Sequence, residues 1–374
     1  MKARIGAVLF GIGIVALVLA AGLYFYVAPS VTALPYDLKA CPEAPAELGP
    51  DDEGCLKPSV AEAKDAKFLY TDGTVEIKTG RLLSTTKVVP RPDLTAELEG
   101  DLADKAVVWD VWSNGVAPDL EPDDAFPNLD GWLASSYSAS LALDRKTAEA
   151  VEWNDQFLDA SAATFPSDEA AAAQPASTEV AFKGLTYKFP FNTEKKSYEY
   201  YDRDLGAATE IKYDGTDKVA GLDVYRFKQV IENQQLVFPA DRLAALAGTF
   251  GGEGATTGAV TYSNTRTIWV EPVTGNFIRV QEQQNKTFTP DVGEPTALLD
   301  GTFVYTEETE KNSAESAKAS RDKLLLVGRT LPIALTVLGA LLVLGGLLIA
   351  MKRSPAGATN SSRHRADQDE TLVS

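Results

Sequence analysis

The chain has 374 residues, of which 45% are hydrophobic and 9% aromatic, and its formal net charge at pH 7 is −18. This composition excludes a disordered protein, and the acidic balance excludes binding to nucleic acid through its phosphates. Two cysteines are too few for a disulfide-dense scaffold, a structural zinc cluster or an iron–sulfur site. We therefore expect neither a metal nor a cofactor.

Residues 1–4 form a short basic tail, and residues 5–27 are an apolar run without a charged side chain. As a helix this run spans about 34 Å, enough to cross a hydrocarbon core of roughly 30 Å. A cleaved signal peptide is the alternative, because Ala20, Ala21 and Gly22 are small enough for a peptidase. The apolar run continues past them to Val27, so we predict an uncleaved transmembrane helix.

Residues 28–60 form a Pro-rich segment that contains both cysteines, Cys41 and Cys55. If this segment lies outside the cell, its oxidising surroundings permit a disulfide. Closing a loop of this size contributes about 3 kcal/mol in the chain-entropy model. Two free thiols are the alternative, and we predict the disulfide.

Residues 61–310 are predicted to form a β-rich ectodomain. Apolar and polar residues alternate at several places, which is typical of strands with one buried face. The predicted strands cover residues 75–77, 107–112, 137–143, 185–191, 225–231, 268–270, 278–280 and 303–305. The dipeptides Asp72-Gly73 and Asp214-Gly215 favour hairpin turns, because such turns need positive φ angles.

One nine-residue pattern occurs twice, at residues 143–151 (LDRKTAEAV) and 270–278 (VEPVTGNFI). Each copy predicts a tight turn between antiparallel strands, and Gly275 suits the left-handed position of such a turn better than Ala148 does. A duplicated, two-lobed domain is one interpretation. Two unrelated hairpins with similar turns are the other.

Two further patterns offer candidate ligand sites. Residues 119–130 contain five acidic residues, whose oxygen atoms could hold calcium. The spacing is not that of an EF-hand, and we expect a solvated acidic loop instead. Tyr198, Tyr200 and Tyr201 could form an aromatic ligand platform, but aromatic strand residues are ordinary core material and we predict that role.

Helices are predicted to be few in the ectodomain. Residues 239–247 form a short candidate with Asp241 as its N-cap, and residues 311–330 form a membrane-proximal helix. The Ala-rich segment 166–178 and the Gly-rich segment 248–258 are predicted to be loops. The Gly-rich segment lacks the Gly-Lys-Ser/Thr signature of a phosphate-binding loop.

Residues 331–351 form a second apolar run, and residues 352–374 a second basic tail. Basic residues at both outer ends of the chain place both termini in the cytoplasm. The large domain would then be extracytoplasmic, held at the plasma membrane by two spans. Pairs of small residues four positions apart (Ala7 and Gly11, Ala16 and Ala20, Gly346 and Ala350) predict close helix packing within one chain or in a homo-oligomer.

The one histidine, His364, lies in the C-terminal tail, so the ectodomain lacks the base of Ser–His–Asp and Cys–His sites. Carboxylate pairs and a Ser–Lys dyad are the enzymatic options that remain, and the sequence singles out neither. We therefore predict a protein that is not an enzyme and has no catalytic residues.

Four segments resemble the porin PorA family of actinobacterial envelope proteins, whose domain has no assigned function: residues 189–191 (FPF), 198–202 (YEYYD), 221–227 (GLDVYRF) and 269–275 (WVEPVTG). The resemblance implies a membrane protein of the actinobacterial envelope. The chain layout is also similar to that of CD36-type scavenger receptors, which present a lipid-binding ectodomain over the membrane.

The leading functional hypothesis from the sequence is a membrane-anchored envelope protein whose ectodomain binds or passes on a surface ligand, with lipid as the specific candidate. A pore or channel component is the second hypothesis, and a scaffold or receptor subunit is the third. A membrane β-barrel is not expected, because its strands need about 9–11 residues and the strands predicted here are shorter.

Overall fold

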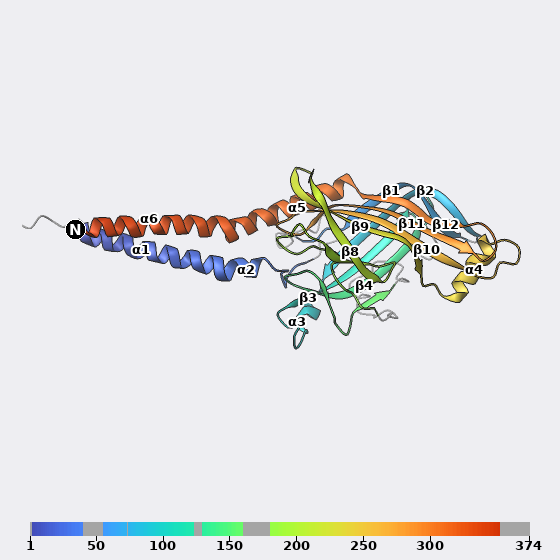
Figure 1. Ribbon diagram of the computed structural model, residues 1–374, viewed down its shortest axis with the longest axis horizontal. Helices are drawn as coiled ribbons and strands as arrows, with labels where there is room; N and C mark the ends of the chain where they lie inside the picture. The colour runs from blue at the N-terminus through green and yellow to red at the C-terminus, as the bar shows by residue number, and fades with distance from the viewer. Residues whose placement is uncertain (1, 40–54, 73, 123–128, 160–179, 352–374) are drawn as a thin grey trace, which may run out of the picture. The chain divides into compact units, whose positions relative to one another are not determined.

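The computed structural model describes residues 2–39, 55–72, 74–122, 129–159 and 180–351. It contains two compact units, Met1–Ala28 with Leu326–Ser374, and Pro29–Leu325. The first unit is a pair of long apolar helices, and the second is a curled antiparallel sheet with helices packed on it (Figure 1). The predicted fold class, a mainly β domain flanked by two apolar helices long enough to span a membrane, is confirmed.

The helix pair consists of α1 and α6, which run antiparallel and side by side. A single π-helical turn adjoins each of them, and these two turns contact each other. The elements are α1 (Lys2–Gly22), η1 (Leu23–Val27), η5 (Leu326–Thr330) and α6 (Leu331–Met351).

Among the described residues, twelve strands form one sheet in which all neighbouring strands are antiparallel. The order is β5-β4-β3-β2-β1-β12-β11-β10-β9-β8-β7, with β6 paired to β4. The strands are β1 (Ser59–Asp72), β2 (Thr74–Pro90), β3 (Ala106–Ala117), β4 (Trp132–Asp144), β5 (Ala150–Val151), β6 (Phe157–Asp159), β7 (Tyr198–Asp202), β8 (Ala207–Val219), β9 (Leu222–Leu236), β10 (Gly258–Val270), β11 (Phe277–Pro290) and β12 (Thr296–Tyr305).

The sheet curls until its two ends meet. Tyr201 of β7 packs in one core cluster with Trp109 of β3 and Leu141 of β4, although these strands lie at opposite ends of the strand order. Residues 184–193, called here the closing segment, connect the two ends. Gly184 accepts a hydrogen bond from Ala150 of β5, and Leu185 exchanges backbone hydrogen bonds with β7.

The closing segment corrects the prediction of a strand at residues 185–191. Its backbone forms only isolated bridges to the sheet, and further along it follows the β10–β11 turn: Phe189 N–H donates to Gly275 O at 3.0 Å. Leu185 and Phe189 fill the inside of the curled sheet, as the alternation predicted. Thr186 and Lys188 are buried as well, so the segment lacks the exposed polar face of the predicted strand.

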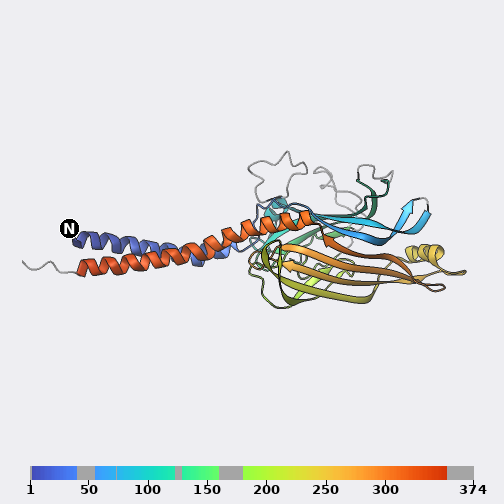
Figure 2. The same cartoon turned by 90° about the horizontal axis from the view of Figure 1, so that it is seen from above.

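Three helices cover parts of the sheet: α3 (Pro92–Ala96), α4 (Ala240–Phe250) and α5 (Glu307–Leu325). Leu246 and Ala247 of α4 share a cluster with residues of β10–β12 and of the β1–β2 hairpin, so α4 lies between these two groups of strands (Figure 2). On the opposite face from the interior, Ala314 and Ala317 of α5 pack against Trp269. The predicted helices near 239–247 and 311–330 are thus present, but Pro239 occupies the N-cap position and Asp241 lies in the first turn.

The two turns predicted from Asp-Gly dipeptides have different outcomes. Asp72 lies at the β1–β2 connection, where it pairs with Thr74, and Gly73 is outside the described residues. Asp214 and Gly215 do not form a turn; they lie within β8 at a bulge, where Asp214 accepts a 2.8 Å hydrogen bond from Arg226 on β9. The β8–β9 turn is instead Ala220-Gly221, with φ angles of 47° and 79°. The sequence prediction failed because Gly215 provides the unusual backbone of a bulge, with φ 145°.

The duplicated pattern forms two equivalent turns. Ala148 N–H donates to Asp144 O at 2.9 Å, and Gly275 N–H donates to Glu271 O at 2.8 Å. Both Ala148 (φ 57°) and Gly275 (φ 75°) are left-handed. The local turn prediction is confirmed for both copies, including the position that Ala148 fits less well.

Candidate functional site

The helix pair is held together by small residues spaced seven positions apart. Gly6, Gly13 and Ala20 are buried on α1, and Pro332, Gly339 and Gly346 are buried on α6. A Cβ added at Gly13 would lie 2.7 Å from the carbonyl oxygen of Gly339, so the two backbones are in direct contact. A seven-residue repeat of this kind keeps one seam of each helix against its partner.

This arrangement decides between the small-residue pairs considered from the sequence. Ala16 and Ala20 lie in the interface, and Gly346 and Ala350 face Gly6. Ala7 and Gly11 are exposed, and a Cβ at Gly11 would meet nothing within 4 Å. Elsewhere both helices expose large apolar side chains, such as Val18 (65%) and Leu348 (64%), as a lipid-facing surface does.

The interior of the sheet contains a second candidate site, a layer of six charged side chains that we call the inner charged layer. Its members are Asp202, Arg203, Asp204, Arg266, Glu282 and Lys286. The residues of β10 that face inward place this layer between apolar ones. Val260 lies on one side of Tyr262, Asn264 and Arg266, and Ile268 lies on the other.

Arg266 is the centre of the first half of this layer. Its guanidinium donates to Asp202 at 3.0 Å, to Glu282 at 2.5 Å and to the side-chain oxygen of Gln229 at 2.5 Å. Burial alone would lower the pKa of Arg266, but the two carboxylates outweigh it and hold the pKa above its ordinary value. Arg266 therefore stays charged and balances acidic groups that are enclosed by the sheet.

Asp204 is the centre of the second half. Its carboxylate accepts a hydrogen bond from Lys286 at 2.7 Å and one from Arg203 at 3.2 Å. Burial would raise the pKa of Asp204, but the two cations hold the pKa well below its usual range. The Arg203 guanidinium also lies 4.3 Å from the centre of the Tyr137 ring, across the interior on β4.

Tyrosines surround the inner charged layer. Tyr262 donates to Asp202 at 3.1 Å, and Tyr200 donates to the carbonyl oxygen of Thr186. Burial raises the pKa of Tyr305 to about 12 and also raises the pKa of Tyr187. These hydroxyls therefore remain protonated at physiological pH.

The outer face of the same strands is polar. On β10 it presents Thr261, Ser263, Thr265 and Thr267, and on the neighbouring β11 it presents Gln281, Gln283 and Asn285. Nine strands have 10–17 residues, so the expectation of strands shorter than those of a membrane barrel was wrong. The hydroxyl and amide side chains on β10 and β11 nevertheless differ from the apolar band by which membrane barrels face lipid.

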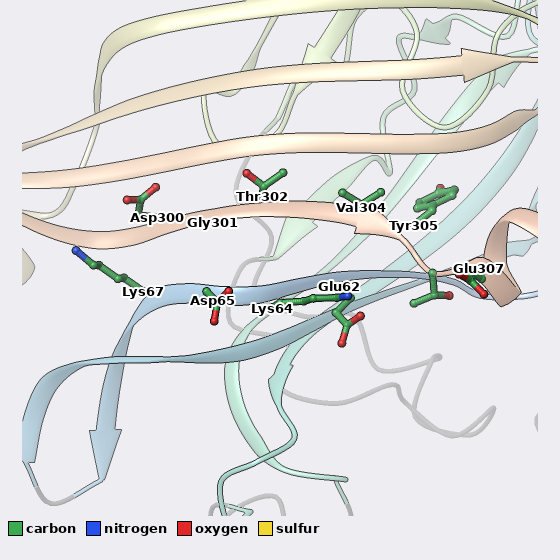
Figure 3. Close-up of a pocket in the computed structure, with 11 residues that line it drawn as sticks. Glu62, Lys64, Asp65, Lys67, Asp300, Gly301, Thr302, Val304, Tyr305 and Glu307 are labelled. Carbon is green, nitrogen blue, oxygen red and sulfur yellow. The ribbon is translucent and has the colours of Figure 1, made fainter. Parts of the chain in front are cut away.

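A groove of about 750 Å³ lies over β1 and β12 (Figure 3). The pairing of these strands is interrupted between Glu62 and Lys67, where β1 bulges. Charged and polar side chains line most of the groove, including Lys64, Asp65 and Asp300. Such a lining suits a polar ligand better than an aliphatic chain.

The other candidate residues from the sequence fall outside any site seen here. Residues 123–128 of the acidic stretch lie outside the described residues, and Asp119 pairs with Arg81 at 3.3 Å. In the part of the chain that the structure describes, no group of three or more metal-ligating side chains occurs. Cys55 is not a free thiol, but Cys41 is outside the described residues, so the Cys41–Cys55 disulfide stays a prediction.

The tyrosines and charges of residues 198–204 have a mixed outcome. Tyr198, Tyr200 and Tyr201 are core residues with exposed fractions of 5–9%, which agrees with the predicted role. The inner charged layer was missed. A signal was present in β10, where Asn264 and Arg266 continue the inward-facing alternation of Val260, Tyr262 and Ile268.

The chain matches a family model and is similar to two known proteins. The model of a family described as Porin PorA matches residues 5–348. A Porin PorA of Corynebacterium resistens is 27% identical over 280 residues, which cover 58% of this chain and 66% of that protein. A Porin PorA of Corynebacterium amycolatum is 26% identical over 252 residues, covering 57% of this chain and 64% of that protein. Each match spans just under two thirds of the relative's length.

Proposed function

Since this chain belongs to the Porin PorA family, we propose that it is a pore or channel component of the cell envelope. This role was the second hypothesis from the sequence, after ligand binding. Family membership carries the proposal, together with two helices that are long and apolar enough to cross a membrane. Both observations are those of a membrane or envelope protein.

In the proposed pore, several copies of the helix pair surround the conducting path. Two helices in direct backbone contact enclose no lumen, so one chain is not enough. The exposed small residues Ala7 and Gly11 on α1 offer a second face for close approach by another copy. The predicted homo-oligomer would therefore use a different face from the one that joins α1 to α6.

The proposed orientation is the one expected from the basic tails, with both termini in the cytoplasm and residues 28–330 outside. The negative charge of the acidic ectodomain would then concentrate cations on the outer side of the membrane. Protease added to intact cells should digest the segment 61–310 and leave peptide tags at both termini protected. Cleavage of the tags with protection of the middle segment would contradict this topology.

Planar-bilayer recordings of the full-length protein test the pore directly. We expect stepwise conductance that prefers cations at low salt. This preference should be lost at high salt, because dissolved ions screen the negative charge of the ectodomain. Gly11→Leu should reduce both the oligomer and the conductance, whereas Val8→Leu, a change between large exposed apolar residues, should leave them unchanged. Absence of conductance from every oligomeric form would exclude the pore.

A further inference from the structure

The inner charged layer contains more hydrogen-bond donors than its own acceptors use. Its three carboxylates are all engaged. Asp202 accepts from Leu205 N–H, Tyr262 and Arg266, Asp204 accepts from both Arg203 and Lys286, and Glu282 accepts from Arg266 and Gln284. Every carboxylate of the inner charged layer is therefore paired with at least two donors.

The cations are not equally engaged. Arg266 uses all three of its guanidinium nitrogens. By contrast, the side chain of Arg203 makes one hydrogen bond among the described residues, to Asp204, and the side chain of Lys286 likewise makes one. A guanidinium has five N–H donors and an ammonium has three, so most donors of these two groups are uncommitted.

A buried amide without a partner lies beside them. Asn264 is 1% exposed, and within the described part of the chain neither its side-chain oxygen nor its nitrogen has a hydrogen-bond partner. It points inward from β10 between Tyr262, whose cross-strand partner is Lys286, and Arg266. A polar group this deeply buried is normally satisfied by a ligand or a water molecule.

The inner face at this level is also accessible. Arg203 keeps 35% of its side-chain surface accessible, Lys286 20% and Asp204 17%, although all three project into the curled sheet. Stacking of Arg203 on the Tyr137 ring occupies the face of the guanidinium and leaves its edge free. The group Arg203–Asp204–Lys286 carries one net positive charge.

We propose that the interior of the sheet binds an oxyanion, a phosphate or carboxylate group held by Arg203 and Lys286 with the amide of Asn264. An oxyanion supplies several acceptor oxygens for the uncommitted donors of Arg203 and Lys286. These two cations share a single carboxylate, Asp204, although the six-residue layer as a whole is neutral. Inorganic phosphate and the phosphate of a lipid headgroup share this chemistry. The site does not depend on the proposed pore.

Thermal unfolding of the full-length protein in a non-ionic detergent tests this site. The probes are inorganic phosphate and dihexanoyl phosphatidic acid, each at low millimolar concentration and at constant ionic strength set with sodium chloride. We expect at least one probe to raise the melting temperature with saturation. Arg203→Gln should weaken that binding at least tenfold, and Lys286→Met serves as a second variant if the first does not fold.

Arg226→Gln is the matched control, because Arg226 pairs with Asp214 and Asp217 on the outer face and should leave binding unchanged. A saturable shift with inorganic phosphate supports a site for a free oxyanion. A shift with the lipid alone, also lost in the variants, supports the same site for a lipid headgroup. No saturable shift, or a shift that both inner variants retain, overturns the proposal.

Discussion

The helix pair and the curled sheet both bring distant segments of the chain together, and they do so by opposite means. In the helix pair the contact depends on the absence of side chains, since Gly13 and Gly339 let the two backbones touch. In the sheet the interior is bridged by long charged side chains around Arg266 and Asp204. The difference follows from the surroundings of each unit.

In the membrane location that we propose for the helix pair, lipid offers no hydrophobic driving force for helix association, so close packing must provide the attraction. The sheet has a polar outer face on β10 and β11, and on its inner face apolar residues lie on both sides of the inner charged layer. Charges enclosed there are tolerated because each carboxylate has a cation beside it. The helix pair should therefore be destabilised most by substitutions that add volume, and the curled sheet by substitutions that remove a charge.

The largest expected effect is from Arg266→Leu. This change leaves the carboxylates of Asp202 and Glu282 enclosed without their central cation, which costs about 3–5 kcal/mol of the free energy of unfolding. Urea unfolding of the full-length protein, followed by tyrosine and tryptophan signals, measures it. Arg226→Leu removes an outer-face arginine and should cost less than about 1 kcal/mol. Equal losses of unfolding free energy in both variants would contradict the claim that the inner charged layer depends on Arg266 more than the outer face depends on Arg226.

Gly13→Leu should weaken the helix pair by about 3 kcal/mol, because overpacking at a backbone contact forces the helices apart. A photo-cross-linker at Leu17, which faces Gly339, should attach to α6 in the unmodified chain and several-fold less in this variant. Gly345→Leu on α6 is the control, since nothing lies within 4 Å of its added Cβ. Unchanged cross-linking in Gly13→Leu would contradict the seven-residue seam.

The closing segment gives a pH-dependent test of the sheet. Burial lowers the pKa of Lys188 to about 7, against the weaker effect of Glu271, and its ammonium donates to the carbonyl oxygen of Thr274 and to Asn276 at 3.0 Å. Above pH 7 the unfolded chain therefore binds a proton that the folded chain has lost, so stability rises with pH. We expect a gain of about 2 kcal/mol from pH 7 to 9.

Lys188→Met provides the control for this titration, because it keeps the length of the side chain without the amine. Its stability should change little over the same range. Urea midpoints measured at pH 7, 8 and 9 compare the two proteins. A parallel rise in Lys188→Met would assign the effect to other groups.

Sequence patterns revealed elements whose residues act locally. The alternation at 137–143 and 225–231 predicted strands correctly. Residues two positions apart lie on the same face of a regular strand, and β4 and β9 are regular strands over these residues. The segment 185–191 has the same alternation, but its environment comes from β7 and the distant turn at Gly275, which no local pattern records.

The candidate sites were less predictable for the same reason. A search for small residues four positions apart found Ala16 and Ala20 but not the seven-residue seam through Gly13, because that spacing has meaning only once α6 is the partner. Likewise Arg266 and Asp202 are 64 positions apart, and ordinary charged residues in the sequence give no sign that they meet inside the sheet.

The smallest expected effect compares the two equivalent turns. Ala148→Gly relieves a left-handed alanine, worth about 1–2 kcal/mol, but it loses a buried methyl group and gives the unfolded chain more freedom, at about 0.8 and 0.4–1 kcal/mol. These contributions nearly cancel, so the free energy of unfolding should change by less than about 0.5 kcal/mol. Gly275→Ala is the positive control, because its Cβ would lie 2.1 Å from the carbonyl oxygen of Phe189 in the closing segment. If both substitutions changed the free energy of unfolding by the same small amount, the close approach of the closing segment to Gly275 would not be what requires glycine at that position.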